Sequence, residues 1–309
     1  MKHERKLIPV RLGKDLSDGL SELAENDFRS LNGEIEYLIA KELMRRGKNK
    51  IGGETYFSAY SAFLWDSENK SIEPVRFSDP VRLADLKRYE SEKREVIDNT
   101  VGFIKGLPAQ NILLYGDRGT GKSATVHAVL NEYTGEGLRI VELKKSDIRD
   151  FPRLANILAD AGKKYKFIVF IDDLSFSESQ DNYAELKAVL EGSIFQTRNI
   201  IIYATSNRRH LIKENFSDRS GDVHLSDTLS EQISLSDRFG ITVTFIKPDR
   251  EEFFDILNGI LAGRGISIEK TKLEKTAEVF CLEKGGRSPR AAKQLADILE
   301  SKIKRGAEF

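Results

Sequence analysis

The stretch Gly116-Asp117-Arg118-Gly119-Thr120-Gly121-Lys122-Ser123 decides the fold of this chain. It satisfies the pattern G-x-x-x-x-G-K-[S/T], in which glycines let the backbone turn tightly so that successive N–H groups point at phosphates. An apolar run over 111–115 precedes the stretch, and a helical pattern over 122–132 follows it. This strand–loop–helix context is the one that such a loop requires. The sequence therefore predicts a phosphate-binding loop at the amino terminus of a helix, whose dipole favours anions.

Residues of this loop have distinct predicted roles. Lys122 is expected to reach the β- and γ-phosphates of ATP, and the hydroxyl of Ser123 is expected to ligate Mg²⁺. The predicted nucleotide-binding residues are Gly116, Asp117, Arg118, Gly119, Thr120, Gly121, Lys122, Ser123 and Ala124.

A second apolar run, Phe167–Ile171, ends in two acids, Asp172 and Asp173. A strand that ends in acids delivers carboxylates to the carboxyl edge of the sheet, where open α/β folds bind their ligands. Asp172 is therefore the expected partner of Mg²⁺. Asp173 is the residue expected to orient or activate the attacking water.

Short apolar runs alternate with helical patterns through most of the chain. Continuous apolarity is typical of strands covered on both faces, and this alternation predicts an α/β fold with a parallel sheet. Strands are expected at 111–115, 138–143, 167–171, 199–204 and 241–246, and helices at 122–132, 152–161 and 183–191. After Pro248, apolar residues spaced by three and four predict a small helical domain.

Composition and hydrophobic periodicity divide the chain into four parts. These are a short module over 1–50, an aromatic-rich connecting segment over 51–80, the nucleotide-binding α/β core over 81–247 and a helical lid over 248–309. The aromatic residues of the second part are Tyr56, Phe57, Tyr60, Phe63, Trp65 and Phe77. Such a cluster at the start of a domain is expected to pack against the sheet, and a base-stacking surface is the alternative.

Charge and cysteine content narrow the class of protein. Lys plus Arg and Asp plus Glu number 49 each. The net charge is therefore zero and does not indicate binding to nucleic acid or to an anionic membrane, although a local basic patch is still possible. The single cysteine, Cys281, excludes an intramolecular disulfide and a Cys-rich metal site. No apolar stretch reaches the length of a membrane-spanning helix, and no signal-peptide pattern opens the chain. A cytoplasmic protein that does not associate with membranes is expected.

Three further segments follow in the order found in AAA+ ATPases, which the chain resembles. The segment 204–209 resembles sensor 1, the segment 235–240 resembles the one that carries the arginine finger, and the segment 286–292 resembles sensor 2. Each segment alone is a weak signal, because an isolated arginine is usually a solvated surface charge. Their order after a phosphate-binding loop is what carries the resemblance.

The resemblance to AAA+ ATPases implies roles for three residues. Asn207 would contact the γ-phosphate or the attacking water, and Arg290 would couple the position of the lid to the state of the nucleotide. Arg238 would reach the γ-phosphate of a neighbouring subunit and stabilise charge in the transition state. A homo-oligomer, either a ring or a filament, is therefore implied.

Over 80–300 the chain resembles more closely a bacterial group of AAA+ proteins known as a domain of unknown function. The stretches that carry this resemblance are 111–122, 172–176, 204–210 and 234–240. The resemblance supports the fold and the nucleotide and implies no biological task. One departure matters: the usual second acid of AAA+ proteins is glutamate, and Asp173 is one methylene shorter, which leaves the hydrolysis rate open.

The first fifty residues have a strand–helix–helix pattern. A strand is expected over 6–12, a helix over 14–26 and a second helix after Ser30, a favourable N-cap. A module of this size cannot bury enough apolar surface alone. It resembles the ribbon-helix-helix module, which implies pairing of two amino-terminal modules in an intertwined dimer.

That resemblance also implies contact with double-stranded DNA. Of the outward-facing strand residues only Arg11 is a good base reader, and Lys6 is a candidate phosphate contact. A module that dimerises or docks a partner without DNA is the alternative.

Three functions stay open on these residues. The first is an ATPase that assembles on a partner and remodels it, with DNA targeting by the amino-terminal module. The second is an ATP-dependent switch with slow turnover. The third is a protein-remodelling ATPase without nucleic acid, against which the segment 146–152 argues because it lacks an aromatic-glycine loop. A nucleoside kinase is disfavoured by the helical tail and the ordered sensor segments.

Overall fold

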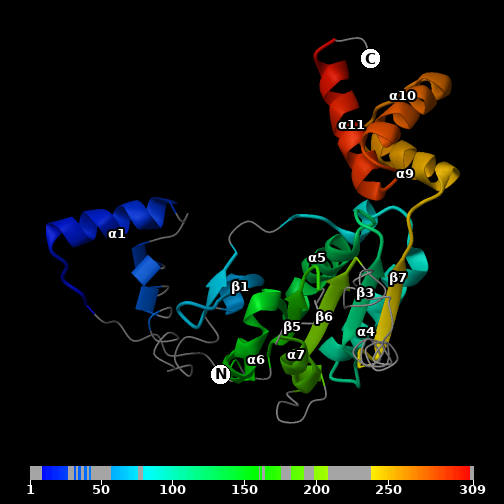
Figure 1. Cartoon of the computed structure of the whole chain (residues 1–309). Coiled ribbons are helices and arrows are strands. Elements are labelled where there is room, and N and C mark those ends of the chain that lie inside the picture. Colours follow the sequence, from blue (N-terminus) through cyan, green and yellow to red (C-terminus); the bar gives the residue numbers. More distant parts are fainter. Residues whose placement is uncertain are drawn as a thin grey trace, which may run out of the picture.

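A seven-stranded sheet organises the chain in the computed structural model (Figure 1). The structure describes residues 9–26, 31–32, 34–35, 38–39, 42, 57–75, 79–159, 161, 164–174, 182–190, 198–207 and 238–306. The strand order is β2-β1-β4-β5-β6-β3-β7.

The five expected strands are confirmed, each within two residues of its expected bounds. They are β3 (Ile112–Gly116), β4 (Leu138–Glu142), β5 (Lys166–Ile171), β6 (Ile200–Ser206) and β7 (Ile241–Phe245), and every neighbouring pair among them is parallel. Because β6 lies between β5 and β3, the carboxyl ends of these three strands meet at one place on the sheet edge. This order brings the phosphate loop, the two acids and Asn207 together, although they are far apart in sequence.

Helices cover both faces of the sheet. On one face lie α4 (Glu90–Ile104) and α5 (Lys122–Tyr133), and on the other lie α6 (Phe151–Ala159) and α7 (Asn182–Leu190). The strand residues between these layers are almost fully buried, which explains their continuous apolarity. Helices α5, α6 and α7 were expected from the sequence, whereas α4 was not.

Part of the aromatic-rich segment contributes two strands to the sheet. Strand β1 (Ala62–Asp66) pairs in parallel with β4, and β2 (Ser71–Pro74) pairs antiparallel with β1 at the sheet edge. Phe57, Phe63 and Trp65 are buried, and the rings of the first two meet edge to face at 5.1 Å. The expected packing is confirmed for these three side chains, and base stacking by them is excluded.

A network of polar contacts fastens the β1–β2 hairpin to the segment that follows β4. Trp65 Nε1 donates to Asp150 Oδ2 at 3.0 Å, and Lys70 Nζ forms an ion pair with the same carboxylate at 2.8 Å. These two partners lower the pKa of Asp150, outweighing the opposite effect of its burial. Tyr56 and Phe77 lie outside the described residues.

The helical lid contains α9 (Arg250–Gly263), α10 (Lys270–Glu283) and α11 (Pro289–Lys304) around a hydrophobic core of its own. Asp249 and Glu252 form a capping box at the start of α9, and the side chain of Ser288 caps α11. Capping of this kind stabilises a helix end by about 1 kcal/mol. The helical domain expected after Pro248 is confirmed.

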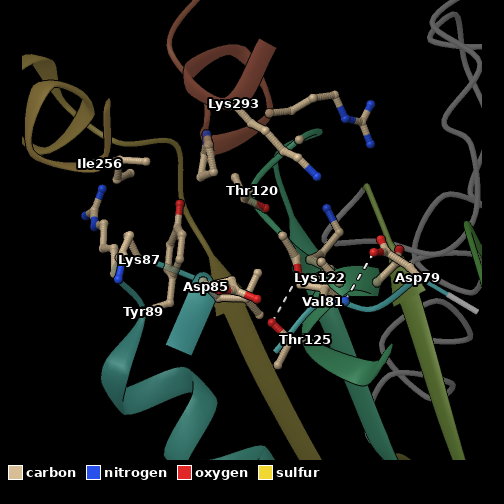
Figure 2. A pocket seen from close by; sticks show the side chains of 18 of the residues that line it. Asp79, Val81, Asp85, Lys87, Tyr89, Thr120, Lys122, Thr125, Ile256 and Lys293 are labelled. Carbon is tan, nitrogen blue, oxygen red and sulfur yellow. Dashed lines mark hydrogen bonds between the residues drawn. The ribbon is translucent and has the colours of Figure 1, made fainter. Parts of the chain in front are cut away.

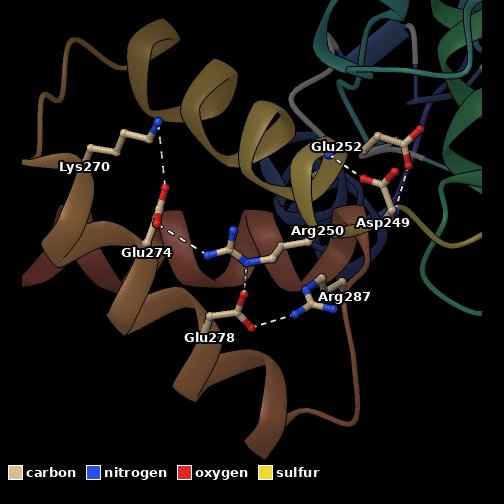
Figure 3. Close-up of polar contacts among 7 residues, drawn as sticks. All are labelled: Asp249, Arg250, Glu252, Lys270, Glu274, Glu278 and Arg287. Atoms are coloured by element: carbon tan, nitrogen blue, oxygen red, sulfur yellow. Dashed lines mark hydrogen bonds and ion pairs between the residues drawn. The ribbon is translucent and has the colours of Figure 1, made fainter.

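Ion pairs tie the three lid helices together (Figure 3). The guanidinium of Arg250 contacts Glu274 at 3.4 Å and Glu278 at 2.8 Å, and Arg287 contacts the other oxygen of Glu278 at 2.7 Å. Glu278 therefore joins the start of α9 to the loop before α11. The pKa of Glu278 is lowered by these arginine hydrogen bonds.

The amino-terminal module is described only in part. Helix α1 (Lys14–Asn26) has the expected bounds, and residues 31–32, 34–35, 38–39 and 42 are helical. Residues 9–12, the described part of the expected strand, form neither strand nor helix. A strand needs a partner for its backbone hydrogen bonds, and these residues pair with no strand in the described part of this chain. None of the helices formed by the described residues combines the length and apolarity that crossing a bilayer requires.

Candidate nucleotide-binding site

A cavity of about 930 Å³ lies where the carboxyl edge of the sheet meets the lid. Its walls come from the phosphate loop, the two acids, the end of β6, the segment 79–89 and the helices α9 and α11. In Figure 2, Ile256 and Lys293 of the lid lie above Thr120 and Lys122 of the loop. A cavity of this size accommodates a cofactor-sized ligand.

Close backbone packing fixes the shape of the phosphate loop. Gly116 has φ 133, and a Cβ there would lie 2.0 Å from the carbonyl O of Phe245 in β7. Gly119 has φ 78, and a Cβ there would approach Ser288 Oγ to 3.0 Å. Only glycine tolerates both the positive φ and the contact. The two glycines therefore let the loop press against β7 on one side and against the lid on the other.

Lys122 is buried, with 6% of its surface exposed. Its ammonium Nζ donates to the carbonyl O of Gly116 at 2.9 Å, to that of Asp117 at 2.7 Å and to Oδ1 of Asn207 at 3.1 Å. Burial lowers the pKa of Lys122 to about 8, against the opposite effect of three nearby aspartates. These three acceptors hold the cation at the carboxyl end of β3, where the sequence places it.

Both acids after β5 take part in hydrogen bonds within the site. Ser123 Oγ donates to Asp172 Oδ1 at 2.7 Å, and Asn207 Nδ2 donates to Asp173 Oδ1 at 2.6 Å. The structure thus brings Lys122, both acids and Asn207 into one polar network. Thr205 of the sensor-1 segment is hydrogen-bonded to both acids, a contact that the sequence did not indicate.

The pair Ser123 and Asp172 fits a Mg²⁺ ion. Magnesium prefers hard oxygen ligands and is bound by one or two protein groups together with substrate phosphates and water. Within the described ranges no group of three or more His, Cys, Asp or Glu side chains could hold a metal by itself. A magnesium ion at this site would therefore depend on the nucleotide.

Arg290 reaches the cavity from the first turn of α11. Its backbone N donates to the carbonyl O of Gly119 at 3.1 Å, which docks the lid on the phosphate loop, and its side chain lines the cavity. Lys293, three residues further along the same helix, lines the cavity as well. A helix places residues three apart on one face, and that spacing after Arg290 was the available signal for Lys293.

The segment before α4 closes the cavity on another side. Asn131 Nδ2 in α5 donates to the carbonyl O atoms of Asp79 and Val81 at 2.7 and 2.8 Å. Tyr89 OH donates to the carbonyl O of Ile246 at 2.6 Å, and burial is the main reason that its pKa is raised to about 12. No sequence motif marks this segment, because its contacts are made largely by backbone atoms.

The segment between β7 and α9 and the start of α9 contact the same region. Arg88 forms an ion pair with Glu252 in α9, and the backbone N of Lys247 donates to Asp117 Oδ2 at 3.1 Å. The lid is thus joined to the core both through the segment before α4 and through the phosphate loop.

Arg238 lies apart from this cavity. It precedes β7, whose first residue Ile241 pairs with Ile112 at the start of β3, so Arg238 stands near the amino edge of the sheet, opposite the phosphate loop. It is half-buried and is not among the residues that line the cavity. The structure therefore separates Arg238 from the other predicted site residues of the same chain.

The remaining predicted residues fall as follows. Arg118, Gly119, Thr120, Gly121, Ser123 and Ala124 line the cavity, whereas Gly116 and Asp117 stand at its base through their contacts with Lys122. Arg11 is exposed in the amino-terminal module, and Lys6 lies outside the described residues. Residues 208–237 also lie outside the described residues, including part of the sensor-1 and arginine-finger segments.

Comparison with known proteins identifies the family. A sequence profile of the family described as "Protein of unknown function (DUF815)" matches residues 58–303. The chain is also similar to the replication factor C large subunit of Thermofilum pendens, with 28% identity over 139 residues, 41% of this chain and 32% of that protein. For the same subunit of Methanococcus vannielii the identity is 25% over 214 residues, 62% of this chain and 42% of that protein. The chain spans less than half the length of these relatives.

Two solved structures are similar in fold. The Thermotoga maritima RuvB Holliday junction branch migration motor has 17% identity and a TM-score of 0.49, covering 74% of this chain and 67% of that chain. AMPPCP-bound DnaA from Aquifex aeolicus has 16% identity and a TM-score of 0.49, covering 73% and 66%. The chain itself has a mostly parallel sheet, a phosphate loop that follows β3 and a carboxyl-terminal helical lid.

Proposed function

The chain belongs to the DUF815 family of AAA+ P-loop proteins, and we propose that it binds ATP with Mg²⁺ and hydrolyses it at subunit interfaces to remodel a partner. One observation carries this proposal. Lys122, Asp172, Asp173 and Asn207 share one polar network beside a single cavity, with Arg290 facing them from the lid.

Binding of the triphosphate is supported by the charges at the loop end of the cavity. Lys122, Arg118, Arg290 and Lys293 all line it, and four cations suit a tri-anionic or tetra-anionic ligand. The helix dipole of α5 adds to their field, because the loop opens directly into its amino terminus. Phosphate oxygens would compete with the carbonyl groups of Gly116 and Asp117 for the ammonium of Lys122.

Hydrolysis is supported by the two acids and Asn207. Ser123 and Asp172 would hold Mg²⁺, which neutralises charge on the phosphates when it is bound. Asp173 would orient the attacking water together with Asn207, whose amide already contacts the Asp173 carboxylate.

Assembly at subunit interfaces is supported by the position of Arg238. It stands near the sheet edge opposite its own phosphate loop, so within one chain it has no path to the γ-phosphate. An arginine that acts in phosphoryl transfer has to come from a neighbouring subunit in that case. We therefore assign it to the neighbour's site, in a ring or filament.

The amino-terminal module would pair two subunits and associate with double-stranded DNA. Val10, Leu16 and Leu23 are exposed by 58%, 69% and 47%. A second module would cover these side chains, which is the physical motive for pairing. DNA contact through Lys6 and Arg11 is the finer part of this proposal.

A second candidate function is an ATP-dependent switch with slow turnover. Asp173 is one methylene shorter than glutamate, and its carboxylate accepts a hydrogen bond from Asn207. A site of this geometry can bind the nucleotide without hydrolysing it rapidly, which is what a switch requires. Protein threading is less well supported. The segment after β4 is fixed by buried Ile148, by the Arg149–Glu185 ion pair and by Asp150, whereas a threading loop has to project and move.

Turnover and assembly measured together separate these functions. ATPase activity with and without double-stranded DNA supports the first when DNA stimulates it, and nucleotide-dependent assembly with negligible turnover supports the switch. The size of the particle with and without a non-hydrolysable ATP analogue decides whether Arg238 can act. If removal of residues 1–50 leaves DNA affinity unchanged, the targeting role is wrong.

A further inference from the structure

One buried hydroxyl links both acids of the nucleotide site. Thr205 lies in β6, and 2% of its surface is exposed. Its Oγ1 donates to Asp172 Oδ1 at 2.5 Å and accepts a hydrogen bond from the backbone N of Asp173 at 3.0 Å. The hydroxyl thus forms one continuous chain of hydrogen bonds from the second acid to the first.

Thr205 also holds the backbone of the acid-bearing turn. Its carbonyl O accepts from the backbone N of Leu174 at 2.7 Å, so the turn after β5 is fixed to β6 at two points. Within this turn Asp173 has φ 50. Such a conformation is strained for a non-glycine residue and persists only where the surroundings determine it. The bonds from Thr205 on either side of Asp173 are surroundings of this kind.

The contacts of Thr205 fix the two carboxylates in different ways. Asp172 Oδ1 accepts from Thr205 and from Ser123, so two hydroxyls from different elements fix its orientation. Asp173, turned by its left-handed backbone, accepts from Asn207. A group that donates to one acid and accepts from the backbone of the next must have both capacities, which a hydroxyl has and a methyl lacks.

We propose that Thr205 is a positioning residue for ATP hydrolysis, acting through Asp172 and Asp173. It orients the first acid toward the Mg²⁺ position beside Ser123 and holds the second in the conformation from which it faces the attacking water. This inference rests on the proposed ATPase function, and it gives a role to Thr205, which lies in the sensor-1 segment two residues before Asn207.

The test compares Thr205→Val with Thr205→Ser in the full-length chain. The valine variant keeps the shape and loses the hydroxyl, so kcat should fall about 10-fold to 100-fold, the range for losing a group that orients a metal ligand. The Mg²⁺ concentration for half-maximal activity should rise. The serine variant should restore most of kcat.

A binding measurement gives a second readout that does not depend on turnover. The affinity for a fluorescent ATP analogue is measured with Mg²⁺ and with EDTA. For Thr205→Val we expect the gain in affinity that Mg²⁺ brings to shrink, while the affinity in EDTA stays at the wild-type value. A merely structural role would lower both affinities together.

Thr100→Val is the matched control. Thr100 is fully buried, donates to the carbonyl O of Val96 and shares a hydrogen bond with Tyr203 OH on the same strand β6. Its loss should lower the melting temperature and leave kcat and the Mg²⁺ requirement unchanged. The proposal is overturned if folded Thr205→Val matches the wild type in both readouts, or if Thr205→Ser is as defective as Thr205→Val. Absence of turnover in the wild type would remove the ATPase function, and the Mg²⁺-dependent affinity would still decide the role of Thr205.

Discussion

The two walls of the nucleotide cavity hold their polar groups in different ways. On the sheet side, Lys122 and Thr205 are buried, and the side chains of Asp172, Asp173 and Asn207 are each hydrogen-bonded to a neighbour. On the lid side, the side chains of Arg290 and Lys293 are exposed and line the cavity. The difference shows that the groups for the chemistry are preorganised at the sheet edge. The lid supplies positive charge, whose distance from the phosphates depends on the position of the lid.

The largest effect should come from the sheet side. Lys122→Ala removes the buried cation at the end of β3, so we expect kcat to fall by at least about 100-fold and the affinity for ATP to fall as well. Turnover and equilibrium binding measure this. Lys105→Ala, which removes an exposed lysine at the end of α4, should behave as the wild type. Wild-type ATP binding by Lys122→Ala would show that the cavity is not the nucleotide site.

A smaller effect is expected on the lid side. Arg290→Ala should lower kcat by about 10-fold, because an exposed charge is partly screened by water, and Lys293→Ala should lower it less. Steady-state kinetics at low and high salt checks the explanation, since the loss should shrink as salt rises. A loss for Arg290→Ala as large as that for Lys122→Ala would break the distinction between the two walls.

The buried position of Lys122 predicts a pH effect that the exposed lid cations do not share. Its pKa is lowered to about 8 from an ordinary 10.5, so between these values the unfolded chain holds more protons than the folded one, and this group adds stability as pH rises through that window. A triphosphate favours the ammonium, so binding near pH 9 should take up a fraction of one proton.

Calorimetry in two buffers of different ionisation enthalpy measures this uptake. The same titration near pH 7 is the control, because Lys122 is then charged before and after binding. Equal proton uptake at the two pH values would contradict the assignment to Lys122.

The smallest effect concerns the contacts that join the lid to the core. Arg88 and Glu252 form an ion pair between the segment before α4 and α9, with both side chains partly exposed. A double-mutant cycle with Arg88→Met and Glu252→Gln should therefore yield a coupling of about 0.2–1 kcal/mol in ATP affinity. A coupling of several kcal/mol would show that the lid is held as firmly as the sheet edge.

Local patterns were enough for several features of this chain. Five apolar runs predicted β3 to β7, and the pattern from Gly116 to Ser123 predicted the loop, because strand and helix periodicity and glycine spacing are local properties. The acids after β5 were predicted for the same reason. The β1–β2 hairpin was missed because its aromatic residues fit both a packed segment and a strand, and helix α4 was not singled out.

What only the tertiary structure decided is which strand ends lie side by side. The position of β6 between β5 and β3 brings Asn207 onto Lys122 and Asp173, and it places Thr205 between the two acids. The same topology puts Arg238 near the opposite edge of the sheet from Lys122. Sequence periodicity reports which face of an element is buried, whereas strand order depends on long-range pairing and on the burial of both faces. The sequence by itself therefore determined the phosphate loop and its strand, and the folded sheet decided which groups surround it.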